Sequence, residues 1–161
     1  MTLVAEAQAI NVLNACRKHG IMIVTAESCT GGLIAGALTD IAGSSDVVDR
    51  GFVTYSNDAK MGMLGVYEAT LAAHGAVSEE VAREMAEGAL RFSRAHIAVS
   101  ITGIAGPGGG SADKPVGTVW IAWKRRGGYA RAQAFQFDGD REAVRRQTVD
   151  RALAGVAELL P

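Results

Sequence analysis

The chain has 161 residues, of which 20% are charged, and its formal net charge is −1. This length favours a single domain over residues 1–161, and the balanced charge gives no indication of a nucleic-acid partner. No run approaches the ~18 apolar residues of a membrane helix, so no membrane association is expected. The 2 cysteines form no disulfide framework and the 3 histidines show no zinc-binding spacing, which predicts a cytoplasmic protein without a metal site.

The hydrophobic pattern predicts helices that alternate with strands, followed by a hairpin. Apolar residues recur at helical spacing from Leu3 until Gly20, which is expected to end the first helix. After it we expect a strand at 21–26, a helix at 30–39, a strand at 49–56, a helix from 57–58 onward, and a long helix capped by Ser78. The later elements are a strand at 95–101, a glycine-rich loop at 102–116, a hairpin of strands 117–124 and 129–137, and a last helix starting at 138–140.

This order of elements is typical of an α/β fold. It predicts a single layered α/β/α domain with a mixed, mostly parallel sheet, flanked by helices and completed by the late β-hairpin. The order of the strands stays open. Ligand sites in such sheets usually lie where strands end and loops begin, and three notable segments, 26–32, 55–60 and 102–110, follow predicted strands.

The turn after the first strand is the first candidate site. It contains Ser28, Thr30, Gly31 and Gly32 at the start of a predicted helix, where hydroxyls and bare N–H groups favour negative charge. Ser28 is interpreted as a nucleophile whose oxyanion meets these N–H groups, as a phosphate ligand, or only as a helix N-cap. Cys29 is either a thiol of low pKa at the helix start or a buried, inert cysteine.

A serine nucleophile needs a base, and no histidine of this chain sits in a conspicuous motif. Lys60 is the better candidate, because it lies in the first turn of a helix that Asn57 is expected to cap. The positive end of that helix disfavours an ammonium ion, and burial lowers the pKa of a lysine further. The Tyr55 hydroxyl is placed to relay a proton or to orient Lys60. The alternative is a solvated surface lysine.

The loop from Ile101 to Gly110 is dense in glycine but is neither a Walker A loop nor a dinucleotide-binding fingerprint. Its backbone N–H groups are suited to an anion, and the alternative is a flexible surface loop. Thr102 would face the same side as Ser28 if their strands are parallel neighbours. The basic clusters at 124–126 and 145–146 are interpreted as solvated surface.

Four segments together resemble one family. They are 27–32 (Glu-Ser-Cys-Thr-Gly-Gly), 55–60 (Tyr-Ser-Asn-Asp-Ala-Lys), 101–109 (Ile-Thr-Gly-Ile-Ala-Gly-Pro-Gly-Gly) and 114–120 (Lys-Pro-Val-Gly-Thr-Val-Trp). In this order and spacing they resemble the CinA C-terminal domain family, the nicotinamide-nucleotide amidases, over roughly residues 5–160. Each motif alone is modest, whereas the four in order are highly specific.

The resemblance implies an amidohydrolase that converts nicotinamide mononucleotide (NMN) to nicotinic acid mononucleotide and ammonia, recycling pyridine nucleotide toward NAD. It implies a cytoplasmic homodimer without a metal or organic cofactor. The family's competence and DNA-damage label does not establish a nucleic-acid function. Alternatives that stay open are a non-catalytic nucleotide-binding module of the same fold and an interaction protein that depends on dimerisation.

Carried onto this chain, the resemblance makes Ser28 the nucleophile and Lys60 the base, with Tyr55 assisting. The substrate-binding residues that it implies are Thr30, Gly31, Gly32, Thr102, Gly103, Gly106 and Gly108. Backbone donors near the first three would hold the oxyanion, and the loop residues would hold the nucleotide phosphate. Arg50 or Lys114 would supply positive charge, or each has only a surface role.

Overall fold

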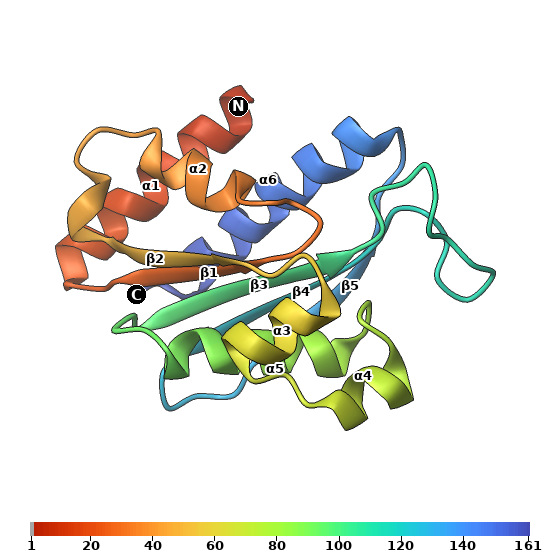
Figure 1. Ribbon diagram of the computed structural model, residues 1–161. Coiled ribbons are helices and arrows are strands. Elements are labelled where there is room, and N and C mark those ends of the chain that lie inside the picture. The colour runs from red at the N-terminus through yellow and green to blue at the C-terminus, as the bar shows by residue number, and fades with distance from the viewer. Residues whose placement is uncertain (1) are drawn as a thin grey trace.

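The fold, seen in a computed structural model that describes residues 2–161, is built on one five-stranded sheet in the order β2-β1-β3-β4-β5 (Figure 1). The strands are β1 (Ile23–Glu27), β2 (Val48–Val53), β3 (Ile97–Gly103), β4 (Thr118–Arg125) and β5 (Arg131–Gln136). Strand β1 pairs in parallel with β2 and β3, whereas β4 pairs antiparallel with β3 and β5. Four of the five strands therefore share one direction, which confirms the predicted mixed sheet and its late hairpin.

Helices cover both faces of the sheet, as the α/β/α prediction requires. One layer contains α1 (Leu3–His19), α2 (Leu33–Thr39) and α6 (Arg141–Leu159), and the other contains α3 (Asn57–Leu64), α4 (Glu68–His74) and α5 (Glu79–Arg91) (Figure 1). A 3₁₀ turn, η1 (Ser44–Asp46), precedes β2. Gly20 ends α1 with a left-handed φ of 64°, and Ser78 caps α5 through the Val81 N–H.

Strand β3 divides the core because successive side chains point to opposite faces. Ile97, Val99 and Ile101 are fully buried in the cluster that α1, α2 and α6 cover. Ala98 belongs to the cluster under α5, and the Ser100 hydroxyl donates to the Ala82 carbonyl of that helix at 2.6 Å. Small side chains on this face bring α5 close to the sheet, which fits the low aromatic content of 6%.

Several local predictions differ from the structure, and two of them concern α3 and α4. Helix α4 lies in a segment for which we expected no element, because none of its residues is fully buried and only Leu71 packs against the core. Helix α3 is capped by Ser56 rather than Asn57, since the Ser56 hydroxyl accepts the Ala59 N–H at 3.0 Å. Lys60 still lies in the first turn, where its N–H donates to the Ser56 carbonyl.

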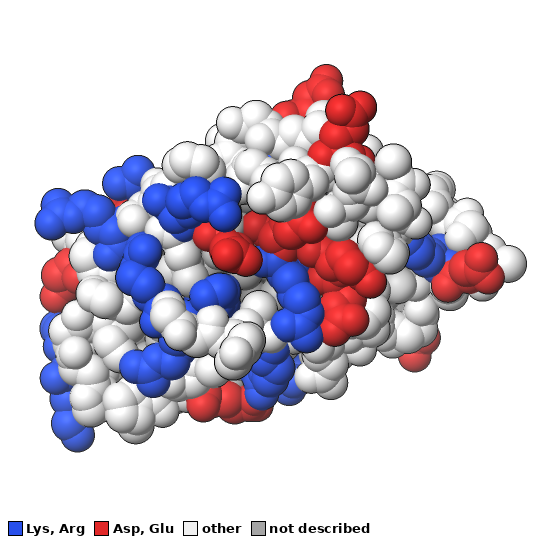
Figure 2. All heavy atoms as spheres, turned by 90° about the horizontal axis from the view of Figure 1, so that it is seen from below, with Lys and Arg blue, Asp and Glu red and all other residues white. Residues whose placement is uncertain are grey.

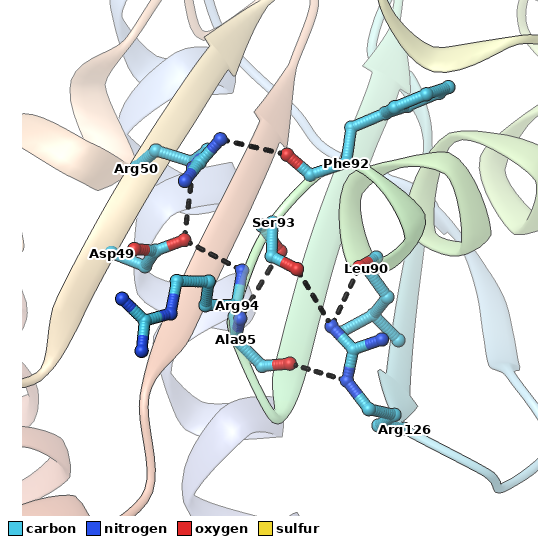
Figure 3. A network of polar contacts seen from close by, with 8 residues as sticks. All are labelled: Asp49, Arg50, Leu90, Phe92, Ser93, Arg94, Ala95 and Arg126. Atoms are coloured by element: carbon cyan, nitrogen blue, oxygen red, sulfur yellow. Dashed lines mark hydrogen bonds and ion pairs between the residues drawn. The ribbon is translucent and has the colours of Figure 1, made fainter.

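Arginine side chains hold the turn at residues 92–96, between α5 and β3, by its carbonyl groups (Figure 3). Arg126 donates to the carbonyls of Leu90, Ser93 and Ala95 at 2.7, 3.1 and 2.9 Å. Arg50 donates to the Phe92 carbonyl, while the Asp49 carboxylate accepts the Arg94 N–H at 2.9 Å. Arg126 is exposed, as predicted for residues 124–126, but its guanidinium also holds this turn.

Charges of both signs lie on the face formed by α3, α4 and α5 (Figure 2). Basic side chains gather toward the left of that view, the end away from the glycine-rich loop, and acidic ones lie across the middle. This mixture agrees with the net charge of −1. Within residues 2–161, every helix is too short or too polar to cross a membrane.

Candidate active site

The carboxyl ends of β1, β2 and β3 meet at one edge of the sheet because these strands run parallel, and a cavity of about 260 Å³ lies there. Of the predicted site residues, those that line it are Ser28, Tyr55, Lys60, Thr102, Gly103, Gly106 and Gly108. Thr30, Gly31 and Gly32 do not line it. The predicted convergence of the three segments in one cleft is therefore present.

Ser28 and Lys60 are in direct contact at the base of this cavity. Lys60 Nζ lies 3.0 Å from Ser28 Oγ, and it also lies 2.9 Å from the Thr54 carbonyl oxygen and 3.2 Å from that of Tyr55. Ser28 follows β1, and Thr54 and Tyr55 follow β2, so the parallel pairing of the two strands brings these groups together. The contact spans 32 residues of sequence.

Lys60 is buried, with 1% of its surface exposed, so the alternative of a solvated surface lysine is wrong. Lys60 lies on helix α3, which packs closely against α5. At this contact Gly88 has no room for a Cβ beside the Leu64 carbonyl. Burial lowers the pKa of Lys60, and the nearby Cys29 opposes this shift. Because a lower pKa raises the fraction of neutral amine, the site is suited to general-base chemistry.

Tyr55 contributes to the site through two separate groups. Its carbonyl oxygen accepts from Lys60, whereas its hydroxyl accepts from Arg141 Nη2 at 3.0 Å. The tyrosine side chain is 61% exposed at the cavity. Tyr55 thus orients the lysine through its backbone, and its phenol connects the cavity wall to α6.

Sequence analysis missed Arg141 as a site residue. It lies in the first turn of α6, lines the cavity, and donates from Nη1 to the Gly106 carbonyl at 2.8 Å. The positive charge expected from Arg50 or Lys114 is absent from the lining, because Arg50 binds the Phe92 carbonyl and Lys114 binds the His74 carbonyl. The only sequence feature that bears on Arg141 is the N-cap pattern at 138–140. It predicts where α6 begins but not the direction in which the helix crosses the sheet.

Glu27 is the second residue that sequence analysis missed. Its carboxylate is fully buried at the start of α2 and accepts N–H groups of Ile34 and Ala35, both at 3.0 Å, and of Gly32 at 3.3 Å. The Thr30 hydroxyl donates to the same carboxylate at 2.5 Å. The positive end of α2 is therefore neutralised by Glu27, and the interpretation of Ser28 as its N-cap is wrong.

The remaining N–H groups of the turn at residues 28–32 divide into engaged and free donors. The Ser28 N–H donates to the Ile101 carbonyl and the Gly31 N–H to the Ser28 carbonyl, both at 3.0 Å. Within residues 2–161, the N–H groups of Cys29 and Thr30 have no oxygen acceptor, and the Cys29 N–H interacts only with its own sulfur. The donors expected at Gly31 and Gly32 are thus in use, while those of Cys29, which lines the cavity, and of the fully buried Thr30 are unpaired.

The Cys29 thiol is inert rather than activated. Burial raises its pKa to about 11, although its own backbone N–H and the charges of Arg145 and Lys60 oppose this shift. Since the thiolate is the reactive form, Cys29 is a poor nucleophile at neutral pH. No group of three or more His, Cys, Asp or Glu side chains suited to a metal ion occurs in the part of the chain that the structure describes.

The model of the CinA C-terminal domain family matches residues 5–160. The chain belongs to this family. It is 59% identical over 139 residues to the nicotinamide-nucleotide amidohydrolase PncC of Escherichia coli K12, covering 86% of this chain and 84% of that protein. The PncC protein of Pseudomonas putida is 52% identical, covering 89% of each chain. The crystal structure of the competence/damage inducible protein CihA from Agrobacterium tumefaciens superposes with a TM-score of 0.96 at 54% identity, covering 99% of both chains. Family and fold are thereby established for this CinA domain.

Proposed function

We propose that this CinA domain is an amidohydrolase that deamidates NMN to nicotinic acid mononucleotide and ammonia. The observation that carries the proposal is the buried Lys60 amine 3.0 Å from the Ser28 hydroxyl, at the base of a cavity. The names of the relatives from Escherichia coli and Pseudomonas putida support the choice of substrate. The cytoplasmic location and the homodimer remain predictions from the family resemblance.

The three contacts of Lys60 explain how it acts as the base. As an ammonium ion, Nζ has an acceptor for each of its three N–H groups in Ser28, Thr54 and Tyr55. As a neutral amine, its two N–H groups stay on the carbonyls and the lone pair faces Ser28 Oγ. The Ser28 hydroxyl then donates to Nζ, which is the arrangement needed to remove its proton.

The reaction proceeds in two acyl-transfer steps. Ser28 Oγ attacks the carboxamide carbon while its proton moves to Lys60, and the free N–H groups of Cys29 and Thr30 stabilise the oxyanion. Lys60 returns the proton to the leaving nitrogen, so that the C–N bond breaks and ammonia departs. Water then attacks the acyl-enzyme with Lys60 as base, and this releases the carboxylate and restores Ser28.

The phosphate of the nucleotide is held by Arg141 and the glycine-rich loop. Arg141 lines the same cavity as Ser28. Its guanidinium has no carboxylate partner within residues 2–161, and a phosphate binds such a group strongly. Among the described residues, the N–H groups of Gly106, Gly108 and Gly109 also have no acceptor. These donors suit an anion better than the start of α2, where Glu27 already stands.

The test is ammonia release from NMN by purified protein, with Ser28→Ala in parallel. We expect turnover by the wild type and a loss of roughly 10⁴-fold or more in the variant, because the nucleophile is removed. The melting temperature should change little, since Ser28 does not cap α2. Full activity in Ser28→Ala would exclude Ser28 as the nucleophile. Binding of NMN to the folded wild type without turnover would favour the non-catalytic nucleotide-binding module.

A further inference from the structure

Arg145 reaches from α6 to the backbone of the 28–32 turn. Its Nε donates to the Cys29 carbonyl at 3.1 Å, and its Nη2 donates to the Thr30 carbonyl at 3.3 Å. The expectation that residues 145–146 form a solvated pair is therefore wrong for Arg145. It holds for Arg146, which is exposed and pairs with Glu142 one helical turn away.

The positive charge of Arg145 is directed at these peptide groups alone. Within residues 2–161 no carboxylate lies within ion-pair distance of its guanidinium. Helix α6 is fastened to the sheet by other contacts, because Val144, Ala152 and Leu153 are fully buried in the core. The contacts of Arg145 with the 28–32 turn are therefore not needed to attach α6 to the sheet.

Peptide geometry connects Arg145 to the two free N–H groups. In a trans peptide the C=O and the N–H point in opposite directions. The Cys29 carbonyl faces Arg145, so the Thr30 N–H of the same peptide points away from it. The Thr30 carbonyl also faces Arg145, and the N–H of the same peptide, which belongs to Gly31, donates to the Ser28 carbonyl. The peptide that contains the Ser28 carbonyl also contains the Cys29 N–H. Arg145 is therefore the first donor in two series of polarised peptide groups. One series ends at the Thr30 N–H and the other at the Cys29 N–H, and neither N–H has an oxygen acceptor.

We propose that Arg145 is a positioning residue for the deamidation, which orients and polarises the N–H groups of Cys29 and Thr30 toward the oxyanion formed at Ser28. This inference rests on the proposed function. Bonds to a charged donor are stronger than neutral ones, and successive hydrogen bonds polarise one another. The Glu27 carboxylate binds the same turn through the Thr30 hydroxyl and the Gly32 N–H, so a negative and a positive side chain together fix its conformation.

The effect of Arg145 should appear in the chemical step and not in substrate binding. The oxyanion exists only in the transition state and the tetrahedral intermediate, so weaker donors lower kcat and leave KM unchanged. A merely structural role would instead lower the melting temperature. The two roles are therefore separable by kinetics.

Arg145 is also accessible from the face of the sheet opposite α5. Its side chain lines a groove of about 470 Å³ between α1, α2 and α6, together with Gly32, Leu33 and Arg146. A small cation that enters this groove reaches the place of the guanidinium without passing through the cavity at Ser28. This access permits chemical rescue of a truncated variant.

The experiment compares Arg145→Met with Arg146→Met, a matched loss of one positive charge on the same groove. We expect kcat of Arg145→Met on NMN to fall by roughly 10²-fold, with KM and melting temperature close to those of Arg146→Met. A low, non-denaturing concentration of guanidinium should restore part of kcat in Arg145→Met only, whereas tetramethylammonium at equal ionic strength should not. An equal kcat in the two variants, or a loss without rescue that follows the melting temperature, would overturn the proposal.

Two further comparisons keep the result decisive. If Arg145→Met does not fold, Arg145→Lys replaces it, and its kcat must also fall because one ammonium group lacks the paired donors. If the wild type releases no ammonia, the proposed substrate fails but the role of Arg145 is still tested. The readout is then the rate at which a fluorophosphonate labels Ser28, which needs the same oxyanion donors but no nucleotide. Equal labelling rates in both variants would contradict the proposal.

Discussion

The 28–32 turn and the 92–96 turn lie at opposite edges of the sheet, and both are held by arginine on carbonyl oxygens and by a carboxylate on N–H groups. Arg145 and Glu27 hold the first, and Arg126 and Asp49 hold the second (Figure 3). In the 92–96 turn every backbone N–H has an acceptor. In the 28–32 turn those of Cys29 and Thr30 have none within the described residues.

The difference shows that arginine and carboxylate side chains can hold a turn either as a plain connection or as part of a binding site. A turn that only connects α5 to β3 gains most when all its polar groups are satisfied, since an unpaired buried donor costs about 1–3 kcal/mol. The 28–32 turn leaves donors unpaired beside Ser28, and helix α3 places the buried Lys60 next to it. Unsatisfied groups held by a rigid frame are typical of a site that binds charge formed during a reaction.

Of the variants that test this contrast between the two turns, Lys60→Met should have the largest effect on activity. Removing the base should lower ammonia release by roughly 10⁴-fold, close to the loss in Ser28→Ala. Because methionine fills a similar space without a buried charge, the variant should unfold at the same or a higher temperature at neutral pH. Ammonia release and thermal unfolding measured on one preparation would check both outcomes. Activity within tenfold of wild type would identify another base.

The pH dependence of the wild type follows from the same residue. Burial lowers the pKa of Lys60 below its ordinary value of 10.5. Between the two values the unfolded chain binds a proton that the folded chain has released, so the free energy of unfolding rises as pH increases through this window. The value of kcat/KM should rise as pH passes through the lowered pKa, where the neutral amine forms, and should level off above it. Lys60→Met should remove that rise in stability, and an unchanged pH profile would argue against the assignment.

Arg141→Met tests an arginine that both holds a loop by its carbonyl group and faces the cavity. Like Arg126 it donates to a carbonyl, that of Gly106, but it also faces the cavity. We expect KM for NMN to rise by roughly 10- to 100-fold, because a charge-assisted phosphate contact is lost. Nicotinamide riboside, which lacks the phosphate, should show little change between variant and wild type. An equal loss with both substrates would place Arg141 in support of Tyr55 rather than on the phosphate.

The sequence predicted the site to the extent that neighbouring strands determine it. Ser28 and Lys60 follow β1 and β2, and Thr102 lies at the carboxyl end of β3. Because these strands run in parallel, the meeting of the three residues at one sheet edge could be inferred from the order of the elements. Arg141 and Arg145 could not be found in this way. They lie on α6, which is 86 residues from Tyr55 for Arg141 and 116 residues from Cys29 for Arg145, and the direction of their side chains depends on how that helix crosses the sheet.

The role of Glu27 was hidden for a related reason. A carboxylate at a strand end is commonly solvated, and its burial became evident only when α2 began at Leu33, three residues later than predicted. Helix α4 was not predicted because only Leu71 packs against the core, and one apolar residue gives no hydrophobic period. Sequence patterns thus predicted the elements that bury apolar faces, whereas the polar groups that connect elements required the structure.

Arg126→Met is expected to have the smallest effect on activity and completes the comparison. Three carbonyl groups lose the hydrogen bond from the guanidinium, so the free energy of unfolding should fall by about 1–3 kcal/mol. The 92–96 turn lies at the edge away from the cavity, so kcat/KM for NMN should stay within about twofold of wild type, a change of less than ~0.5 kcal/mol. Arg94→Met is the matched control, since it removes a positive charge from the same turn while its backbone N–H stays on Asp49. Denaturant unfolding and ammonia release measured on both variants separate the two quantities. A loss of activity in Arg126→Met at unchanged stability would mean that the two edges of the sheet are coupled and that the turns do not act independently.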